Sequence, residues 1–145
     1  MSVEQVARDL VSNMNNAEKM KTMVTVDAMA SGGVLPQAVP VMEAMKVVAG
    51  LTTAFPDLKF DIQQVTVKGN QATVKALWGG TNTGPLSLPM PGMPTIPATG
   101  KRVSVKDIYI VTVQGDKVSH MQVESPPDGG IPGAMAQLGV KVPSM

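Results

Sequence analysis

Two carboxylates and two further proton-transfer groups lie near one another in the C-terminal third of the sequence. Asp107 and Tyr109 fall in one segment of alternating polar and apolar residues, and His120, Gln122 and Glu124 fall in the next. When two carboxylates approach each other, the like charges resist joint ionisation and the pKa of one of them rises. A carboxyl group with a raised pKa can accept or donate a proton near neutral pH. These residues predict acid/base catalysis, with Asp107, Glu124 and His120 as catalytic candidates.

The pairing of the two segments decides whether these side chains meet. Segments 102–114 and 117–125 are predicted to be antiparallel strands, because Gly115-Asp116 between them is a favoured hairpin turn. Side chains opposite each other in such a hairpin have Cβ atoms about 5 Å apart. The predicted pairs on one face are Val113 with Val118, Val111 with His120, Tyr109 with Gln122, and Asp107 with Glu124.

The other face of this hairpin is more apolar, so the sequence leaves open which face lies inside. That face would carry Lys106, Ile108, Ile110 and Thr112 opposite Ser119, Met121, Val123 and Ser125. If it forms the core, the two carboxylates are solvated and His120 is an ordinary structural residue. A slip of one residue in the register would also move every partner to the opposite face.

A second hairpin supplies candidates for substrate binding. Segments 60–68 and 71–83 are predicted to be strands joined by the turn Gly69-Asn70. Alternation places Trp78 and Asn82 on one face of the second strand. Trp78 is the only tryptophan, and an indole beside a cavity can be both a core anchor and a platform for a ligand.

The elements that must position these hairpins are predicted to be helices. Apolar residues at three- and four-residue steps indicate helices over 3–14 and 17–29, and a third from residues 36–40 to 55. Ser2 begins the first with a capping-box pattern, and Asn15-Asn16 separates it from the second. Helices followed by hairpins predict an α+β fold.

The remaining segments complete a single predicted domain over 1–145, a common domain size. Its helical part spans 1–55, its curved sheet 58–125 and its tail 126–145, with a short helix expected at 133–138. Residues 85–100 contain five prolines, which rule out a regular helix or strand. The leucines and methionines of this loop predict that it packs over an apolar pocket.

Composition argues against several classes of function. Cysteine is absent and His120 is the single histidine, so neither thiolate chemistry nor a metal site is expected. The net charge is +1 and the basic residues are scattered, which argues against nucleic acid or a membrane as partner. The first residues have no continuous apolar stretch, so no signal peptide or membrane span is predicted and a cytoplasmic location is expected.

Several short motifs together resemble a known family. From about residue 54 to residue 140 the sequence carries AFPDL, WGGTNTGPL, PATGKRVSV, DIYIV, GDKVSHMQVE and QLGV. Their order and spacing resemble the SnoaL-like polyketide cyclases, within the ketosteroid-isomerase and nuclear-transport-factor-like superfamily. The resemblance implies a cone-shaped, curved antiparallel sheet wrapped around N-terminal helices and enclosing an apolar pocket. It also implies that the face with Asp107 lines the pocket, and that the outer face forms a homodimer.

The chain departs from the family's pattern at two places. Thr81-Asn82-Thr83-Gly84 stands where the family often has Thr-His-x-Gly, and His120-Met121-Gln122 stands where it often has Glu-His-Trp. Asp107 best matches the aspartate of the family's DIYR-like strand, and Glu124 lies near its late acidic position. The resemblance therefore implies an acid/base role for a carboxylate and leaves open which one is the base.

Three functions are compatible with these residues. The first is an enzyme that abstracts a proton next to a carbonyl in a hydrophobic small molecule, like a polyketide or ester cyclase or a ketosteroid isomerase, with no cofactor. Its base would be Asp107 or Glu124, and Tyr109, Asn82 or His120 would donate to the enolate oxygen. The substrate-binding candidates are Tyr109, Gln122, Trp78 and Asn82. The alternatives are a non-catalytic small-molecule-binding protein of the same fold and a structural subunit with a filled interior.

Overall fold

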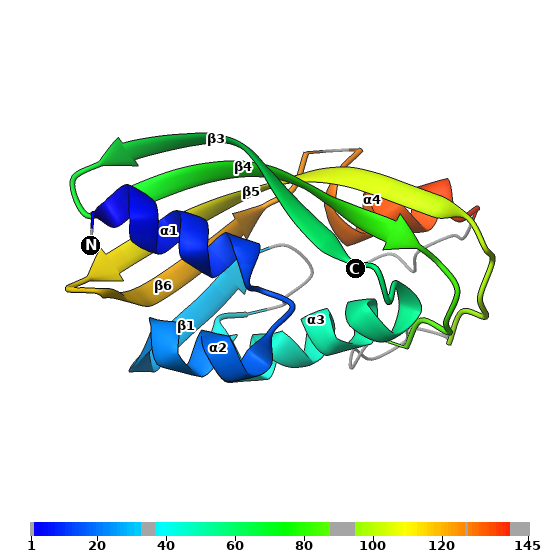
Figure 1. The fold of residues 1–145 in the computed structure, drawn as a ribbon, viewed down its shortest axis with the longest axis horizontal. Coiled ribbons are helices and arrows are strands. Elements are labelled where there is room, and N and C mark those ends of the chain that lie inside the picture. The colour runs from blue at the N-terminus through cyan, green and yellow to red at the C-terminus, as the bar shows by residue number, and fades with distance from the viewer. Residues whose placement is uncertain (1, 33–36, 88–94, 127, 140–145) are drawn as a thin grey trace.

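The computed structural model describes residues 2–32, 37–87, 95–126 and 128–139 (Figure 1). In chain order, the elements are α1 (Val3–Ser12), α2 (Ala17–Met23), β1 (Val24–Gly32), β2 (Val39–Pro40), α3 (Val41–Ala54), β3 (Lys59–Lys68), β4 (Gln71–Thr81), β5 (Arg102–Gln114), β6 (Lys117–Glu124) and α4 (Gly130–Gln137). The predicted α+β class, with helices first and hairpins after, is confirmed.

Within the described residues the strands form one six-stranded sheet in the order β2-β1-β6-β5-β4-β3. Its pairs are antiparallel except β1 and β6, which run parallel. Figure 1 shows the strands curving together with α1 lying across them. Helix α1 contacts β3, β4, β5 and β6, α3 contacts β1 and β2, and α4 contacts β5. The sheet thus wraps around the N-terminal helix, as expected.

Local capping explains where the first two helices begin. The Ser2 side chain accepts a hydrogen bond from the backbone N–H of Gln5, and the Asn16 side chain accepts one from the N–H of Lys19. Both bonds satisfy donors that have no partner inside the helix. The predicted break at Asn15-Asn16 is confirmed.

The predicted helix over 17–29 is wrong in its second half. Helix α2 ends at Met23, and Val24–Gly32 is strand β1. The β-branched run Val24-Thr25-Val26 loses rotamer freedom in a helix and suits a strand. Pairing with β6 then satisfies the backbone of the second half of β1. The third helix, predicted to start between 36 and 40, begins at Val41, and the helix in the tail begins at Gly130 rather than at 133.

The hairpin of β3 and β4 has the predicted turn, with Lys68 paired to Gln71 across Gly69-Asn70. The hairpin of β5 and β6 also has its predicted turn, with Gln114 paired to Lys117 and Val113 to Val118. Beyond these pairs the predicted register is wrong. Thr112 pairs with His120, so Ser119 is an extra residue in β6 that makes a β-bulge.

This bulge reverses the faces of the rest of β6. Tyr109 pairs with Val123 instead of Gln122, and Glu124 pairs with Ile108 instead of Asp107. We call the face of the sheet that carries Asp107 the inner face and the opposite one the outer face. A single inserted residue moves every later side chain to the other face, because side chains alternate along a strand.

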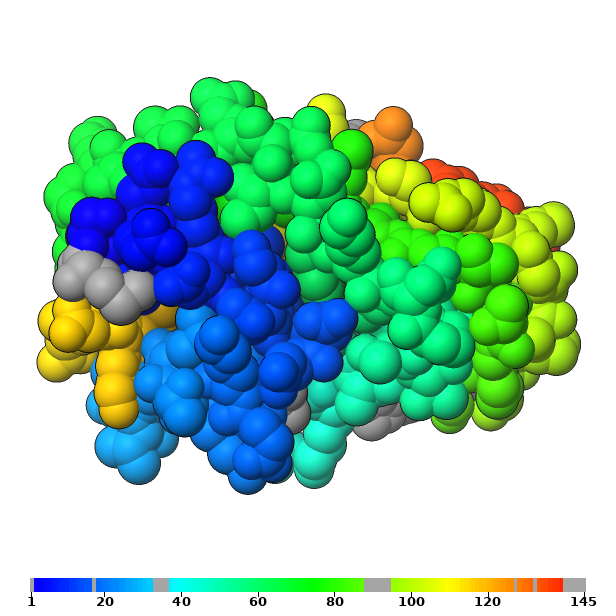
Figure 2. Space-filling model, in the orientation of Figure 1, coloured from blue at the N-terminus to red at the C-terminus, as the bar shows by residue number. Residues whose placement is uncertain are grey.

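The inner face of the sheet and the helices bury the core. Alternate residues of β4 and β5 are buried on this face, and α1 adds Val6, Ala7, Leu10 and Val11. Figure 2 shows α1, α2 and α3 forming much of the surface on this side of the molecule. No helix in the described part of the chain is long and apolar enough to cross a membrane.

Candidate functional site

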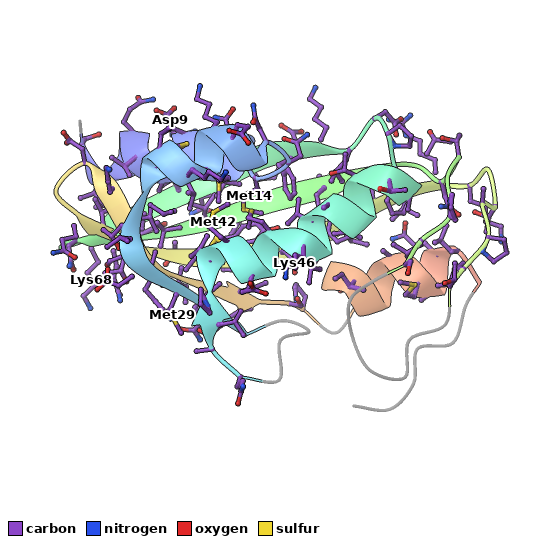
Figure 3. All side chains as sticks on the ribbon, turned by 90° about the horizontal axis from the view of Figure 1, so that it is seen from below. Asp9, Met14, Met29, Met42, Lys46 and Lys68 are labelled. Carbon is purple, nitrogen blue, oxygen red and sulfur yellow. The ribbon has the colours of Figure 1, made fainter. Side chains whose placement is uncertain are left out.

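A cavity lies between the inner face of the sheet and the helices. Water-sized molecules can place their centres in about 90 Å³ of it, several times the roughly 10–15 Å³ that one water requires. In Figure 3, Met14, which lines the cavity, lies between α1 and α3. The other lining residues are Ala30, Gly32, Ala44, Met45, Val47, Val48, Leu51, Phe60, Trp78, Asp107, Tyr109, Met121, Val123, Ser125 and Ile131.

Asp107 is the polar centre of this cavity. Its side chain is buried, at 5% exposure, in the middle of β5. The Trp78 indole Nε1–H on the neighbouring strand β4 donates to Oδ2 of Asp107 at 2.7 Å. The Ser125 hydroxyl, just after β6, donates to Oδ1 at 2.6 Å. The two donors hold both oxygens of the carboxylate in fixed positions.

Helix α4 closes the same corner of the cavity. Gly130, its first residue, has φ of 62°, and a Cβ there would lie 3.1 Å from Oδ1 of Asp107 and collide with Oγ of Ser125. Glycine is therefore required for both backbone conformation and space. Its small size leaves room for the hydrogen bond between Ser125 and Asp107.

The electrostatics of the site suit a proton acceptor. Burial raises the pKa of the Asp107 carboxyl above its ordinary value, although the hydrogen bonds from Ser125 and Trp78 act in the opposite direction. Among the described residues that line the cavity, Asp107 has the only side chain that carries a formal charge at neutral pH. The carboxylate thus lies in apolar surroundings with no cation beside it.

Tyr109 lies on the same face of β5, two residues from Asp107. Burial raises the pKa of its hydroxyl well above the ordinary value, and the nearby Asp107 charge raises it further. Among the described residues, the hydroxyl has no hydrogen-bond partner, yet it is not one of the fully enclosed polar atoms. Tyr109 therefore remains a neutral hydrogen-bond donor that lines the cavity and is available to a ligand.

The predicted catalytic residues do not all meet. Because of the bulge at Ser119, His120, Gln122 and Glu124 lie on the outer face of the sheet, away from Asp107. The His120 Nε2 atom lies 3.2 Å from the Ser31 hydroxyl, and Gln122 donates to Glu124 at 3.5 Å. The predicted pair of opposed carboxylates is therefore wrong. Desolvation, not a second carboxylate, raises the pKa of Asp107.

Asn82 was a candidate for substrate binding, but its side chain organises loops. It is fully buried, its amide N–H groups donate to the carbonyls of Ala54 and Gly84, and its oxygen accepts from the backbone N–H and hydroxyl of Thr99. All its polar atoms are occupied and it does not line the cavity. The predicted loop over 85–100 lies partly outside the described residues, but Leu86 and Ile96 pair in a buried bridge.

Ser125 and Gly130 belong to the site and were not predicted from the sequence as site residues. The alternation pattern placed Ser125 on the face opposite Asp107, and no sequence signal marked the bulge that brings it back. Trp78, Asp107 and Tyr109 were predicted and do meet at the cavity. In the described part of the chain no group of three or more histidine, cysteine, aspartate or glutamate residues could hold a metal ion.

Comparison with known proteins adds a family. The sequence pattern of the SnoaL-like polyketide cyclases matches residues 3–123. No functionally curated protein matches the sequence.

Solved structures share the fold. A proposed SnoaL-like polyketide cyclase from Jannaschia sp. CCS1 is 23% identical, with a TM-score of 0.69, covering 85% of this chain and 84% of that one. AclR, a proposed hydroxylase from Streptomyces galilaeus, is 17% identical with a TM-score of 0.75, covering 99% and 83%. A ketosteroid isomerase-like protein from Catenulispora acidiphila, solved with trimethylamine, is 14% identical with a TM-score of 0.66, covering 93% and 92%. At these identities the likeness establishes the ketosteroid isomerase-like fold alone.

Proposed function

We propose that this chain, which belongs to the SnoaL-like polyketide cyclase family, is a cofactor-independent enzyme that moves a proton next to a carbonyl in an apolar small molecule. The family and the named neighbours support a cyclase-like function in general terms. The fold alone does not select a reaction, because one fold can host many activities. The specific proposal therefore rests on the cavity.

The observation that carries the proposal is the state of Asp107. A buried carboxylate, fixed by hydrogen bonds at both oxygens and raised in pKa by desolvation, has the properties of a general base that works near neutral pH. The structure-based candidate for the base is thus Asp107 and not Glu124. The apolar walls, including Met45, Val48 and Met121, would bind the hydrocarbon part of the substrate.

The proposed reaction has two proton steps. Asp107 takes the proton from the carbon next to the carbonyl, and the electron pair of that C–H bond forms an enolate. Tyr109 donates a hydrogen bond to the enolate oxygen, where the negative charge develops. The enolate carbon then attacks a second carbonyl in a cyclase, or is reprotonated at another position in an isomerase. Asp107 returns the proton in either case.

Turnover of a panel of β-keto esters and enones tests this proposal. Asp107→Asn should lower kcat/KM by about 10²–10⁴-fold, the usual contribution of a general base. Glu124→Gln is the matched control, because it removes a carboxylate from the outer face of the same hairpin. Equal turnover in wild type and Asp107→Asn, with a substrate of the panel consumed, would remove the carboxylate mechanism.

A second candidate is a binding protein without catalysis, and the aromatic residues give it a specific ligand class. Phe60, Trp78 and Tyr109, three of the four aromatic residues in the chain, line the cavity together with Asp107. Aromatic faces and a carboxylate attract organic ammonium ions, and the Catenulispora neighbour was solved with trimethylamine. If Trp78 fluorescence shows binding of an alkyltrimethylammonium ion but not of its neutral tert-butyl analogue, and no turnover occurs, this second function is favoured.

The outer face is the proposed site of a homodimer. Leu77, Ile108 and Ile110 are only half-buried there, between Thr73, Thr112 and the polar residues of β6. Met121 and Val123, expected on this face, lie on the inner face instead. The proposed surface is therefore less apolar than the sequence predicted.

A further inference from the structure

The two donors that hold Asp107 differ in what they can do when the carboxyl group gains a proton. An indole N–H can only donate a hydrogen bond. A serine hydroxyl can donate through its own hydrogen and accept through its lone pairs. Trp78 therefore faces Oδ2 as a permanent donor, whereas Ser125 faces Oδ1 with a bond that can reverse.

This difference decides where the proton can reside. A proton on Oδ2 would weaken the bond from Trp78, and its O–H would find no acceptor among the described residues that contact that oxygen. A proton on Oδ1 can be donated to Oγ of Ser125, 2.6 Å away. Ser125 is exposed, so its own hydrogen can turn to solvent water at the same time.

We propose that Ser125 is a positioning residue that donates to Oδ1 of ionised Asp107, accepts from Oδ1 of protonated Asp107, and so keeps the transferable proton on Oδ1. In its use of this proton the inference rests on the proposed function. The C–H bond next to the carbonyl breaks, its proton joins Oδ1 and its electron pair forms the enolate. Return of the proton from Oδ1 restores the carboxylate and the original direction of the bond from Ser125.

The surroundings of the pair are built for this contact. Gly130, at the start of α4, leaves the space in which Oγ of Ser125 approaches Asp107. The neighbouring titratable group on the inner face is Tyr109, which stays neutral because burial raises its pKa. No other titratable side chain contributes to the shifted pKa of Asp107. A change in the hydrogen bonds of Asp107 with pH therefore reports Asp107 itself.

The single tryptophan makes the inference measurable without a substrate. A ¹H–¹⁵N correlation spectrum contains one indole Nε1–H signal, from Trp78, and its position reports the hydrogen bond to Oδ2. In a pH titration of the wild type, this signal should move once and remain in the hydrogen-bonded region at acid pH. Asp107→Asn should abolish the transition, which assigns it to Asp107.

Two serine variants test the positioning role. Ser125→Ala should move the transition midpoint to higher pH, because a hydrogen bond to an ionised carboxylate is stronger than one from a neutral carboxyl group. Ser125→Thr retains the hydroxyl and should return the midpoint to the wild-type value. The dispersion of the remaining backbone signals controls for folding in each variant.

Two outcomes would overturn the inference. An indole signal that moves to the unbonded region at acid pH would place the proton on Oδ2. A midpoint that is unchanged or lower in Ser125→Ala would show that Ser125 does not stabilise the carboxylate. Turnover of the β-keto ester and enone panel is measured separately, so a wild type with the expected spectra and no turnover would remove the proposed enzyme function and leave the assignment of Oδ1 intact.

Discussion

Asp107 shows how a single residue is made reactive at the expense of stability. Desolvation favours its protonated form in the folded protein, while Trp78 and Ser125 keep the ionised form from being expelled. An apolar residue of similar size would fit the same walls without this conflict. The retention of a charge with no cation beside it is understandable if the charge performs chemistry.

The first prediction concerns the pH dependence of stability. The folded pKa of Asp107 is raised above its ordinary value of 3.8, so its favourable contribution is present below that value and is lost as pH rises through the folded pKa. Urea unfolding at about pH 4 and about pH 7 should show that Asp107→Asn gains stability relative to wild type at the higher pH. Glu124→Gln controls for the loss of an exposed carboxylate. A constant difference between Asp107→Asn and wild type would contradict the burial argument.

The second prediction separates catalysis from stability at Tyr109. Its hydroxyl makes no hydrogen bond within the described residues, so Tyr109→Phe should change the free energy of unfolding by no more than about 0.5 kcal/mol. If the hydroxyl stabilises the enolate, the same variant should lower kcat by about 10²-fold. Urea unfolding and steady-state kinetics on one preparation check both values. Unchanged kcat would remove Tyr109 from the mechanism.

At the scale of elements, the sequence predicted the hairpins, turns and helix starts because these have local causes. Glycine turns, Ser2 and Asn16 as caps, and Pro56 as a stop all act within a few residues. The bulge at Ser119 has no such signal, because it depends on how β6 fits between β5 and the parallel strand β1. For this reason Asp107, Tyr109 and Trp78 were placed correctly, and the three residues of β6 were not.

The third prediction concerns the attachment of α4, which carries Gly130 and Ile131 to the cavity. The Gln137 amide donates to the carbonyl of Ser104 at 2.8 Å and accepts from its N–H at 3.0 Å, so it acts like an added strand beside β5. Gln137→Ala should destabilise the protein by about 1–2 kcal/mol, and Gln137→Glu, which cannot donate, by less. Urea unfolding ranks the three proteins. Faster exchange of the Ser104 amide in Gln137→Ala would localise the effect, and no change in either variant would show that α4 is held by other contacts.

The whole molecule has one face of its sheet committed to the core and the other available for a partner. The inner face meets α1 and the cavity, so the half-buried Leu77, Ile108 and Ile110 of the outer face have no role in the site. A stable interface buries about 800 Å² on each partner. A sheet face of this extent is the natural surface to supply it, and association through it would leave the cavity of each copy intact.

The fourth prediction tests this association with a substitution in the middle of the outer face. Ile110 lies on β5 with Thr73 on one side and Gln122 on the other, so Ile110→Lys would place two like charges near each other in a two-fold dimer. Thr66→Lys, on β3 at the margin of the same face, is the matched control because it adds the same charge. Sedimentation equilibrium should show a dimer for wild type and Thr66→Lys and a monomer for Ile110→Lys. Ligand binding in the cavity should persist in the monomer, since the charge lies on the opposite side of the sheet. A wild type that is monomeric at all concentrations, or an Ile110→Lys variant that remains dimeric, would place the association elsewhere or exclude it.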